Sequence, residues 1–345
     1  MIAKKDENKD VLVQVSDVKT WFPIKKGFLR RVVGQVKAVD GVSLSIRRGE
    51  TVGLVGESGC GKTTLGRTIL RLIPATSGGV AYSVDGEMND LFELDSAEMF
   101  SIRRRMQTIF QDPNSSLNPR MSVGDIVGEY MKIHQIPNRQ ERTVSLLESV
   151  GLSSGYLHRY PHAFSGGQRQ RIAIARALSL DPEFVVCDEP VSALDVSVQA
   201  QIINLLRTLQ QERDLTYLFI SHDLSVVQHL SDRMGVMYLG QVVEFGEVHA
   251  LFRQPLHPYT EGLLSAIPSY QPSGRGRSRS RIVLEGDVPS PANPPTGCRF
   301  HTRCRYVEEV CRQEAPPLVP IDDSSKHYVA CHLADKLTLK GVDEG

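Results

Sequence analysis

The sequence lacks the features of a membrane-embedded, secreted or polyanion-binding protein. No apolar run approaches the roughly 18 to 20 residues that span a bilayer. The N-terminus, MIAKKDENKD, is charged and has no apolar core of the kind found in signal peptides. Lys plus Arg equal Asp plus Glu at 40 each, so no overall field attracts the chain to nucleic acid or anionic lipid. These absences predict a cytoplasmic protein whose contacts with membranes or polyanions are local.

Cysteine is scarce except near the C-terminus. Of the six cysteines, Cys60 lies in a Gly-rich loop and Cys187 in an apolar run, and neither is expected to bind metal. The other four form the pattern C-x5-C-x6-C-x19-C and are Cys298, Cys304, Cys311 and Cys331. In a reducing compartment such a cluster favours metal over disulfides.

The spacing of the four C-terminal cysteines does not identify the metal. Structural zinc sites usually carry closely spaced C-x2-C pairs, which are missing here. Four thiolates suit a tetrahedral metal and an iron–sulfur cluster equally well. Three nearby histidines, His301, His327 and His332, could replace a ligand. The residues alone therefore leave zinc, an iron–sulfur cluster and free thiols open.

The organisation of the chain predicts an α/β protein. An apolar fraction of 41% and a charged fraction of 23% over 345 residues are typical of a soluble globular protein with one large domain and an appendage, or with two domains. Short alternating runs over residues 11–46 predict an antiparallel β layer. Residues 50–73 then read as a buried strand, a Gly-rich loop and a helix. Helical patterns dominate from about residue 95 to 180.

The second half of the chain resumes the strand pattern and then changes in composition. Two apolar runs, EFVVCD and LTYLFIS, flank the helical SVQAQIINLLRTLQQER, as in a parallel sheet. After Leu251 proline becomes frequent. Residues 273–281, SGRGRSRSR, read as a solvated linker, because a nucleic-acid patch would be expected to carry aromatic residues.

The strongest motif is GESGCGKTT at residues 56–64, which fits the phosphate-binding loop G-x-x-x-x-G-K-[ST]. Its glycines let backbone N–H groups wrap around phosphates. Lys62 is expected to reach the β- and γ-phosphates of a nucleotide, and the Thr63 hydroxyl to ligate Mg²⁺. The residues expected to contact the nucleotide here are Gly56, Glu57, Ser58, Gly59, Cys60, Gly61, Lys62, Thr63 and Thr64.

Four further side chains are candidates for the hydrolytic chemistry. Asp188 and Glu189 follow an apolar strand, at the end where ligands bind in open α/β sheets. Asp188 is expected to hold Mg²⁺ through water, and Glu189 to act as the general base on the attacking water. His222 follows another apolar run, where it could contact the γ-phosphate. Gln111 could reach both Mg²⁺ and the water, although a lone His or Gln is ordinarily structural or solvated.

A second anion-binding pattern lies about a hundred residues after the first. The stretch FSGGQRQRIAIARAL at 164–178 opens a helix with a Ser-Gly-Gly turn, whose free N–H groups suit an anion. One nucleotide does not obviously need two such turns.

Taken in order, GESGCGKTT, Gln111, FSGGQ, VVCDEP, SALD and His222 resemble the ATP-binding subunit of ATP-binding cassette (ABC) transporters. The similarity covers about residues 11–250, and Phe164 stands where the family usually has Leu. It implies a RecA-like P-loop NTPase core with an N-terminal antiparallel β subdomain, a helical signature subdomain and a C-terminal cysteine-containing extension. The domains expected are an ATPase domain over 1–260, with its helical part at about 95–180, and the extension over 261–345.

The resemblance implies an answer to the question of the second turn. In this family two cassettes pack head to tail, and each signature turn holds the partner's ATP. The residues so assigned are Ser165, Gly166, Gly167 and Gln168, with Asp195 in the loop at the interface. An aromatic residue near the N-terminus normally stacks on adenine, and Phe22 is preferred over Trp21 for that role.

Longer strings such as QDPNSSLNPRMSVG and PLHPYTEGLLSAIP resemble the peptide importer branch of the family, which also includes importers of nickel, glutathione and some sugars. This branch implies two membrane-spanning permease subunits, an external solute-binding protein and a second, related ATPase subunit, with a homodimer as the alternative. The chain is then expected on the cytoplasmic face of the membrane, coupled through residues 111–123. Its branch also implies a [4Fe-4S] cluster on Cys298, Cys304, Cys311 and Cys331. A cassette ATPase that works on nucleic acid without a transporter is the other functional class.

Overall fold

The computed structural model describes residues 11–28, 30–267, 281–322 and 326–342, so most of the expected linker at 273–281 lies outside the described residues. The chain forms two compact units, each made of several segments. The first unit comprises Met1–Val13, Ser45–Thr51 and Ala81–Ser221. The second comprises Gln14–Leu44, Val52–Val80 and His222–Gly345. The predicted boundary near residue 260 stays a prediction.

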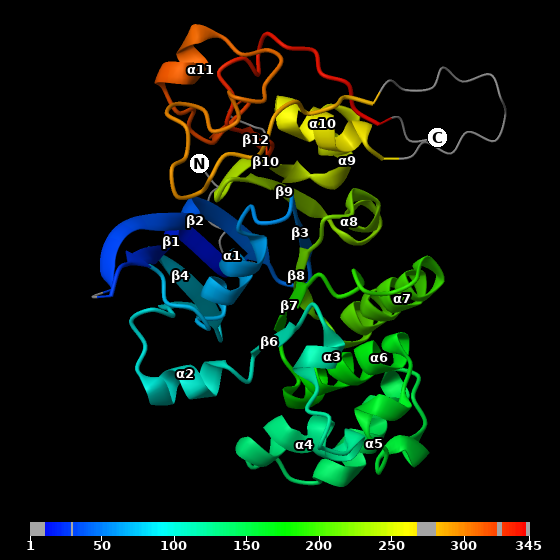
Figure 1. Cartoon of the computed structure of the whole chain (residues 1–345). Coiled ribbons are helices and arrows are strands. Elements are labelled where there is room, and N and C mark those ends of the chain that lie inside the picture. The colour runs from blue at the N-terminus through cyan, green and yellow to red at the C-terminus, as the bar shows by residue number, and fades with distance from the viewer. Residues whose placement is uncertain (1–10, 29, 268–280, 323–325, 343–345) are drawn as a thin grey trace, which may run out of the picture. The chain divides into compact units, whose positions relative to one another are not determined.

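A parallel sheet lies in the first unit (Figure 1) and contains β6 (Met106–Ile109), β7 (Phe184–Asp188) and β8 (Thr216–Ile220). Every residue of β7 and β8 is buried, which explains their unbroken apolar sequence. The connection between them is α7 (Val196–Arg213), whose buried Ile202, Leu206 and Leu209 recur at helical spacing. The predicted strand, helix and strand are therefore confirmed.

The rest of the first unit is mainly helical. Figure 1 shows α4, α5 and α6 packed beside one another, and α4 contacts both of the others. The helices are α2 (Ser96–Ile102), α3 (Pro113–Ser116), α4 (Val123–Ile133), α5 (Arg139–Ser149) and α6 (Gly166–Ala177), with 3-10 turns at Ser154–Tyr156, Pro161–Ala163 and Leu178–Leu180. Strand β6 lies inside the segment expected to be helical, because four residues are too few to give a clear strand period.

The second unit contains a mixed sheet in the order β3-β9-β10-β12-β11. Strand β3 (Thr51–Val55) pairs in parallel with β9 (Arg233–Tyr238), and β9 pairs antiparallel with β10 (Gln241–Glu247). The C-terminal extension adds β12 (Tyr328–Val329) to β10 and then β11 (Val319–Pro320) to β12. The helices of this unit are α1 (Lys62–Ile69), α8 (Leu224–Leu230), α9 (Val248–Arg253), α10 (Pro258–Ser265) and α11 (Glu309–Gln313).

The predicted N-terminal β layer is present as a four-stranded sheet in which β1 (Val11–Lys26) lies between β2 (Arg31–Arg47) and β4 (Ser77–Val84). The second half of β4 pairs antiparallel with β5 (Glu87–Asp90) in the first unit. Buried and exposed residues alternate along parts of β1 and β2, as a half-buried sheet requires. Among the described residues no helix combines the length and the hydropathy needed to cross a membrane.

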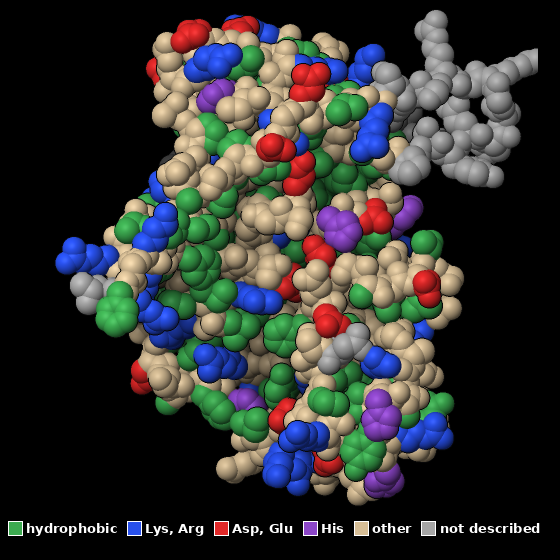
Figure 2. Space-filling model, viewed as in Figure 1, with side chains coloured by type: hydrophobic (Ala, Val, Ile, Leu, Met, Phe, Trp, Pro, Cys, Tyr) green, Lys and Arg blue, Asp and Glu red, His purple; other side chains and the backbone are tan. Residues whose placement is uncertain are grey.

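Surface charge agrees with the balanced composition. Figure 2 shows Lys and Arg interspersed with Asp and Glu among apolar and uncharged polar side chains on the visible face. The tip between β1 and β2 carries Lys25, Lys26 and the fully exposed Phe28.

Candidate functional site

The predicted phosphate loop connects the end of β3 to the start of α1. Gly56, Gly59 and Gly61 have φ values of 149°, 80° and 110°, a region that L-residues rarely adopt. A Cβ at Gly56 would lie 2.1 Å from the Met237 carbonyl oxygen, and one at Gly61 would lie 2.1 Å from that of Ala38. Glycine is therefore required here by both conformation and space, and the strand, loop and helix context of the motif is confirmed.

Lys62 lies at the centre of this loop. Its ammonium donates hydrogen bonds to the carbonyl oxygens of Gly56, at 2.7 Å, and Glu57, at 3.0 Å. The side chain is only 4% exposed, so the loop closes around a buried positive charge. Burial raises the pKa of the adjacent Cys60 thiol, which keeps that group neutral. The loop thus presents a cation and backbone donors, the groups that bind phosphate.

The loop residue Glu57 has partners that the sequence did not indicate. Its carboxylate accepts two hydrogen bonds from Arg303, and its N–H donates to the Tyr259 hydroxyl at 2.9 Å. Arg303 lies 246 residues after Glu57, and Tyr259 lies 202 residues after Glu57, so no local pattern could reveal either contact.

In the first unit the candidate base Glu189 lies directly after β7. Gln111 donates a hydrogen bond from Nε2 to Glu189 Oε2 at 3.0 Å. Sheet register explains this contact, because Ile109 pairs with Cys187 and both side chains stand two residues further along their chains. The structure therefore brings Gln111 and Glu189 together. Asp188, the last residue of β7, is 2% exposed.

The backbone of Glu189 is unusual. Its φ of 45° lies in the left-handed region, where a non-glycine residue costs on the order of 1–3 kcal/mol. Its N–H donates to the Ile220 carbonyl at 3.0 Å, and its carbonyl accepts from the Ser192 hydroxyl at 3.1 Å. The carboxylate is therefore aimed by a fixed turn.

The signature turn begins helix α6. Ser165 is the N-cap: its hydroxyl oxygen accepts from the Gln168 N–H at 3.3 Å, and the Gln168 side chain accepts from the Ser165 N–H at 3.0 Å. The N–H groups of Gly166 and Gly167 fall in the first turn of a 12-residue helix, where backbone donors have no partner within the helix. A Cβ at Gly167 would lie 2.5 Å from Val198 Cγ1, so glycine also permits the close approach of α7.

Two neighbours of the signature turn support it. Phe164 is 4% exposed and contacts Tyr156 edge to face at 5.2 Å between ring centroids, which explains why an apolar residue suffices there. Asp195 is the N-cap of α7 without a side-chain cap bond, and it is exposed. Gln199 fixes the loop before it by donating to the carbonyls of Val191 and Leu194, each at 3.0 Å.

The remaining predicted residues lie in the second unit. His222 is exposed two residues after the end of β8. Phe22 on β1 is 39% exposed. The indole N–H of Trp21 donates to Asp40 at 3.0 Å, and the Lys37 ammonium lies 4.8 Å from the centroid of the Trp21 ring. Because the Trp21 ring already has these partners, the exposed Phe22 remains the better candidate for stacking on a base.

The four C-terminal cysteines are all free thiols. Cys298, Cys304 and Cys331 are each close enough to Cys311 for its charge to affect their pKa values. Burial, reinforced by the neighbouring cysteines, raises the pKa of Cys298, Cys304 and Cys331 to about 11 each. The Cys298 N–H donates to the Cys311 carbonyl at 2.8 Å. Within the described ranges no group of three or more His, Cys, Asp or Glu side chains is placed to hold a metal ion. The nearby histidines are His301, His327 and His332. One ring nitrogen of each already lies within hydrogen-bond distance of a protein oxygen.

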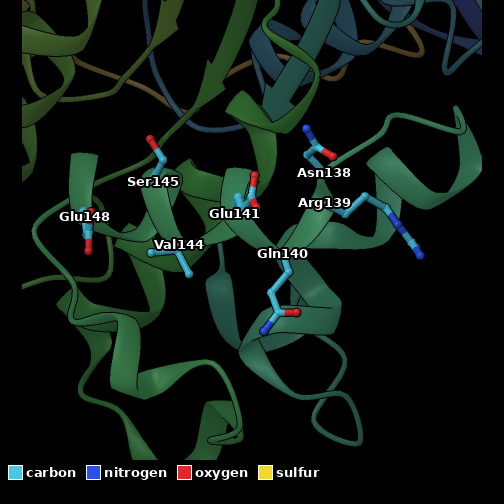
Figure 3. A pocket seen from close by; sticks show the side chains of 7 residues that line it. All are labelled: Asn138, Arg139, Gln140, Glu141, Val144, Ser145 and Glu148. Carbon is cyan, nitrogen blue, oxygen red and sulfur yellow. The ribbon is translucent and has the colours of Figure 1, made fainter.

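Two surface hollows lie on the helical segment. One is lined by α5 and the residue before it, as Figure 3 shows for Asn138, Arg139, Gln140, Glu141, Val144, Ser145 and Glu148. The other extends from α4 to Leu157 and His158. Neither contains a residue of the phosphate loop or the signature turn, although Met121, Ser122 and Gly124 of the QDPNSSLNPRMSVG string line the second.

Comparison with known proteins gives two family matches. A model described as "ABC transporter" matches residues 39–192, and one described as "Oligopeptide/dipeptide transporter, C-terminal region" matches residues 243–311. The chain is 51% identical over 330 residues to the oligopeptide transport ATP-binding protein AppF of Bacillus subtilis, covering 94% of this chain and 98% of that one. It is 47% identical over 337 residues to OppF of Escherichia coli, covering 96% and 98%.

Solved structures agree on the fold. A dimeric post-hydrolysis state of the ATP-binding cassette MJ0796, bound to ADP and Pi, matches with a TM-score of 0.59 and 29% identity over 69% of this chain and 99% of that chain. CbiO1 from Clostridium perfringens, part of the ABC transporter complex cbiONQ, matches with a TM-score of 0.59 and 25% identity, covering 70% and 91%. The expected cassette fold is therefore confirmed. With its phosphate loop, signature turn and near full-length similarity to these relatives, the chain belongs to the ATP-binding subunits of oligopeptide and dipeptide ABC transporters.

Proposed function

We propose that this chain is the ATPase that energises import of oligopeptides or dipeptides. The observation that carries the proposal is the 51% identity, over 94% of the chain, to an oligopeptide transport ATP-binding protein. The match includes the C-terminal region, where residues 243–311 fit the oligopeptide/dipeptide transporter model. A cassette ATPase that works on nucleic acid would have no reason to carry that region.

The phosphate loop fits ATP with Mg²⁺. Lys62 and the loop N–H groups neutralise the β- and γ-phosphates, and the open space at Gly59 leaves the loop backbone accessible there. Thr63 and Asp188 supply the hard oxygen ligands that Mg²⁺ prefers, the latter through water. Gln111 assists at the metal and at the attacking water. Bound Mg²⁺ would stabilise the charge that develops on the phosphates.

Glu189 is proposed as the general base that accepts the proton of the attacking water. The hydrogen bond from Gln111 and the fixed turn at Glu189 support this role, because both orient the carboxylate before the nucleotide arrives. His222 is proposed to contact the γ-phosphate and position the water. Phe22 is proposed to stack on the adenine.

The signature turn is proposed to bind the ATP of a second cassette. Ser165, Gly166, Gly167 and Gln168 present donors at the positive end of the α6 dipole, and Asp195 lies in the loop that reports the state of that interface. A γ-phosphate held by two chains stabilises the closed dimer only until hydrolysis. The proposed partners are a second, related ATPase subunit, two permease subunits that hold the chain at the cytoplasmic face of the membrane, and an external solute-binding protein.

A [4Fe-4S] cluster on Cys298, Cys304, Cys311 and Cys331 is proposed for the extension. Four free thiols are the donor set that such a cluster requires. When bound, such a cluster would crosslink the extension and could exchange one electron. The four cysteines would hold it as thiolates, so binding would release the protons that burial now retains.

The function is tested by reconstitution. The purified chain, its partner ATPase and the permease subunits are assembled in proteoliposomes, and phosphate release is measured with and without peptide-loaded binding protein. Loaded binding protein is expected to stimulate hydrolysis several-fold, and added DNA is expected to have no effect. Stimulation by DNA but not by the permease and binding protein would refute the transport assignment.

A further inference from the structure

The phosphate loop is held by a residue of the C-terminal extension. Arg303 Nη1 donates to Glu57 Oε2 at 2.7 Å, and Nη2 donates to Glu57 Oε1 at 3.0 Å. This two-pronged geometry is the strongest form of a guanidinium–carboxylate pair. The Arg303 side chain is only 6% exposed and that of Glu57 is 29% exposed, so solvent screens the pair weakly.

The backbone of Glu57 is fixed as well as its side chain. Its N–H donates to the hydroxyl of the fully buried Tyr259 at 2.9 Å, and its carbonyl accepts from the Lys62 ammonium at 3.0 Å. The carboxylate, N–H and carbonyl of this one loop residue are therefore each bonded to a different side chain. The entry to the loop takes its shape from α10 and the extension as well as from its glycines.

Arg303 in turn packs beside a cluster of buried aromatic rings. Three buried rings, those of Tyr238, Tyr259 and Phe300, form an aromatic cluster with centroids 4.8 to 5.3 Å apart. The Arg303 guanidinium lies 5.9 Å from the Tyr238 ring centroid, and the Arg303 N–H donates to the Phe300 carbonyl at 3.0 Å. Because these rings are buried and packed against one another, the guanidinium has little freedom to leave Glu57.

An acidic side chain in a phosphate loop needs such a partner. Glu57 follows Gly56 directly, and its carbonyl accepts from the Lys62 ammonium at 3.0 Å, so its carboxylate belongs to the loop that would receive a triphosphate. An unneutralised carboxylate there would repel the phosphates and compete for Lys62. Pairing with Arg303 cancels that charge and directs the side chain toward the extension.

We propose that Arg303 is a positioning residue for nucleotide binding, acting through Glu57 on the phosphate loop. The inference rests on the proposed function, because it assumes that the loop binds ATP. The extension thereby acts on the nucleotide affinity of the cassette, in addition to whatever its cysteines bind.

The chain offers a matched control two residues further on. Arg305 donates to Glu261 at 3.0 Å, and its side chain is 49% exposed. It comes from the same turn of the extension but pairs with α10 instead of with the loop. Replacing it removes a similar arginine–carboxylate pair without touching Glu57.

The test measures the Kd of Mg-ATP for full-length chains that carry Glu189→Gln to prevent hydrolysis. Arg303→Met is expected to raise the Kd at least tenfold. Arg303→Lys is expected to raise the Kd by a smaller factor, since lysine keeps the charge but cannot donate two parallel hydrogen bonds to the carboxylate. Adding Glu57→Gln to Arg303→Met is expected to recover part of the loss, because the unpaired carboxylate is gone. Arg305→Met is expected to leave the Kd within about twofold, because Arg305 does not contact Glu57 and the buried Glu261 keeps the Tyr306 hydroxyl and the Lys340 N–H as partners. Thermal unfolding without nucleotide is recorded for each variant.

Four outcomes would overturn the proposal. Unchanged affinity in Arg303→Met, with wild-type chains binding ATP, would leave the ATPase assignment intact and reduce the pair to a structural one. Equal loss in Arg303→Met and Arg305→Met, in step with lower melting temperatures, would show that general loosening of the extension is the cause. A double variant no better than Arg303→Met would refute the electrostatic argument. If wild-type chains failed to bind ATP, this inference and the proposed function would fall together.

Discussion

At the scale of single residues, the strained turn at Glu189 and its hydrogen bond from Gln111 support the hydrolytic role proposed for these two side chains. Side chains in sparsely populated backbone regions persist only where their surroundings enforce them, and such positions concentrate at functional sites. Here β8 and Ser192 enforce the turn through hydrogen bonds to the N–H and carbonyl of Glu189. The carboxylate therefore needs little reorganisation for the general-base role proposed for it.

Glu189→Gln is expected to lower the rate of phosphate release at least a hundredfold while leaving ATP binding intact, because an amide cannot accept the proton. The substitution also keeps the shape that Gln111 contacts. Hydrolysis is measured by phosphate release, and the trapped ATP dimer by size-exclusion chromatography. Glu148→Gln, an exposed carboxylate on α5, serves as the control. Normal turnover by Glu189→Gln would move the base to another residue.

Sequence reasoning predicted which strands and helices carry the motif residues, but not the long-range partners of those residues. The phosphate loop, the signature turn and the carboxylates after β7 each follow from a short motif with a physical reason, and the structure gives them the expected strands and helices. The pair between Glu57 and Arg303 joins positions 246 residues apart, so it leaves no periodic or local signal. Contacts of this kind depend on the folded topology.

At the scale of secondary-structure elements, α6 and α7 are locked together at the signature turn. A Cβ at Gly167 would lie 2.5 Å from Val198 Cγ1, whereas one at Gly166 would lie 3.4 Å from Leu194 Cδ2, an ordinary contact. A side chain can therefore be accommodated at Gly166 but not at Gly167 unless Val198 moves.

Gly167→Ala is expected to destabilise the chain by roughly 1–3 kcal/mol, the usual effect of overpacking, whereas Gly166→Ala should change stability by less than about 0.5 kcal/mol. Urea unfolding followed by circular dichroism gives the two values. Adding Val198→Ala to Gly167→Ala should restore most of the loss, because it removes the atom in conflict. Equal stability of the two single variants would show that the α6–α7 contact relaxes freely.

Helix α10 depends on a neutral histidine. His257 is fully buried, its Nδ1 accepts from the Tyr259 N–H at 3.1 Å, and burial lowers its pKa to about 3. The unfolded value is about 6.5, so the unfolded chain binds the proton more readily. The stability that this group contributes is therefore complete above pH 6.5 and is lost as the pH falls toward 3.

His257→Asn preserves an N-cap side chain that does not titrate. Wild-type chains are expected to lose roughly 2 kcal/mol more than this variant between pH 7 and pH 5, in line with a slope of about 1.4 kcal/mol per pH unit below the unfolded pKa. Chemical denaturation at each pH measures the difference. Parallel stability curves for the two proteins would mean that His257 is already solvated.

At the scale of the whole molecule, the extension is part of the ATPase. It supplies two strands to the sheet of the second unit, and Arg303 to the phosphate loop. Arg303 lies between Cys298 and Cys304, in a segment whose turns are closed by bonds from the N–H groups of Cys298, His301 and Arg303. A change in what the cysteines bind is therefore expected to shift the segment that carries Arg303, which contacts Glu57.

Anaerobically purified chains are expected to contain about four irons each and to lose them in Cys298→Ser/Cys304→Ser variants, as a four-thiolate cluster requires. Loss of iron should also weaken Mg-ATP binding several-fold, because the turn that carries Arg303 loosens. Iron analysis and equilibrium ATP binding test both statements. Cys187→Ala, in the core strand β7, should keep its iron. Zinc in place of iron would correct the cofactor, and full ATP affinity without metal would uncouple the two sites.

Strand β11, at the edge of the sheet, also affects the tendency of the chain to associate with its own copies. Strand β11 contains two residues and ends at Pro320, which has no N–H to offer a neighbouring strand. Short strands and prolines protect an exposed sheet border against addition of a further chain. A chain shortened before Val319 would present the longer, mostly buried β10 as its border instead. Such a truncated protein should be prone to aggregate even where its phosphate loop is intact, so colloidal solubility is a property that the final residues confer on the entire subunit.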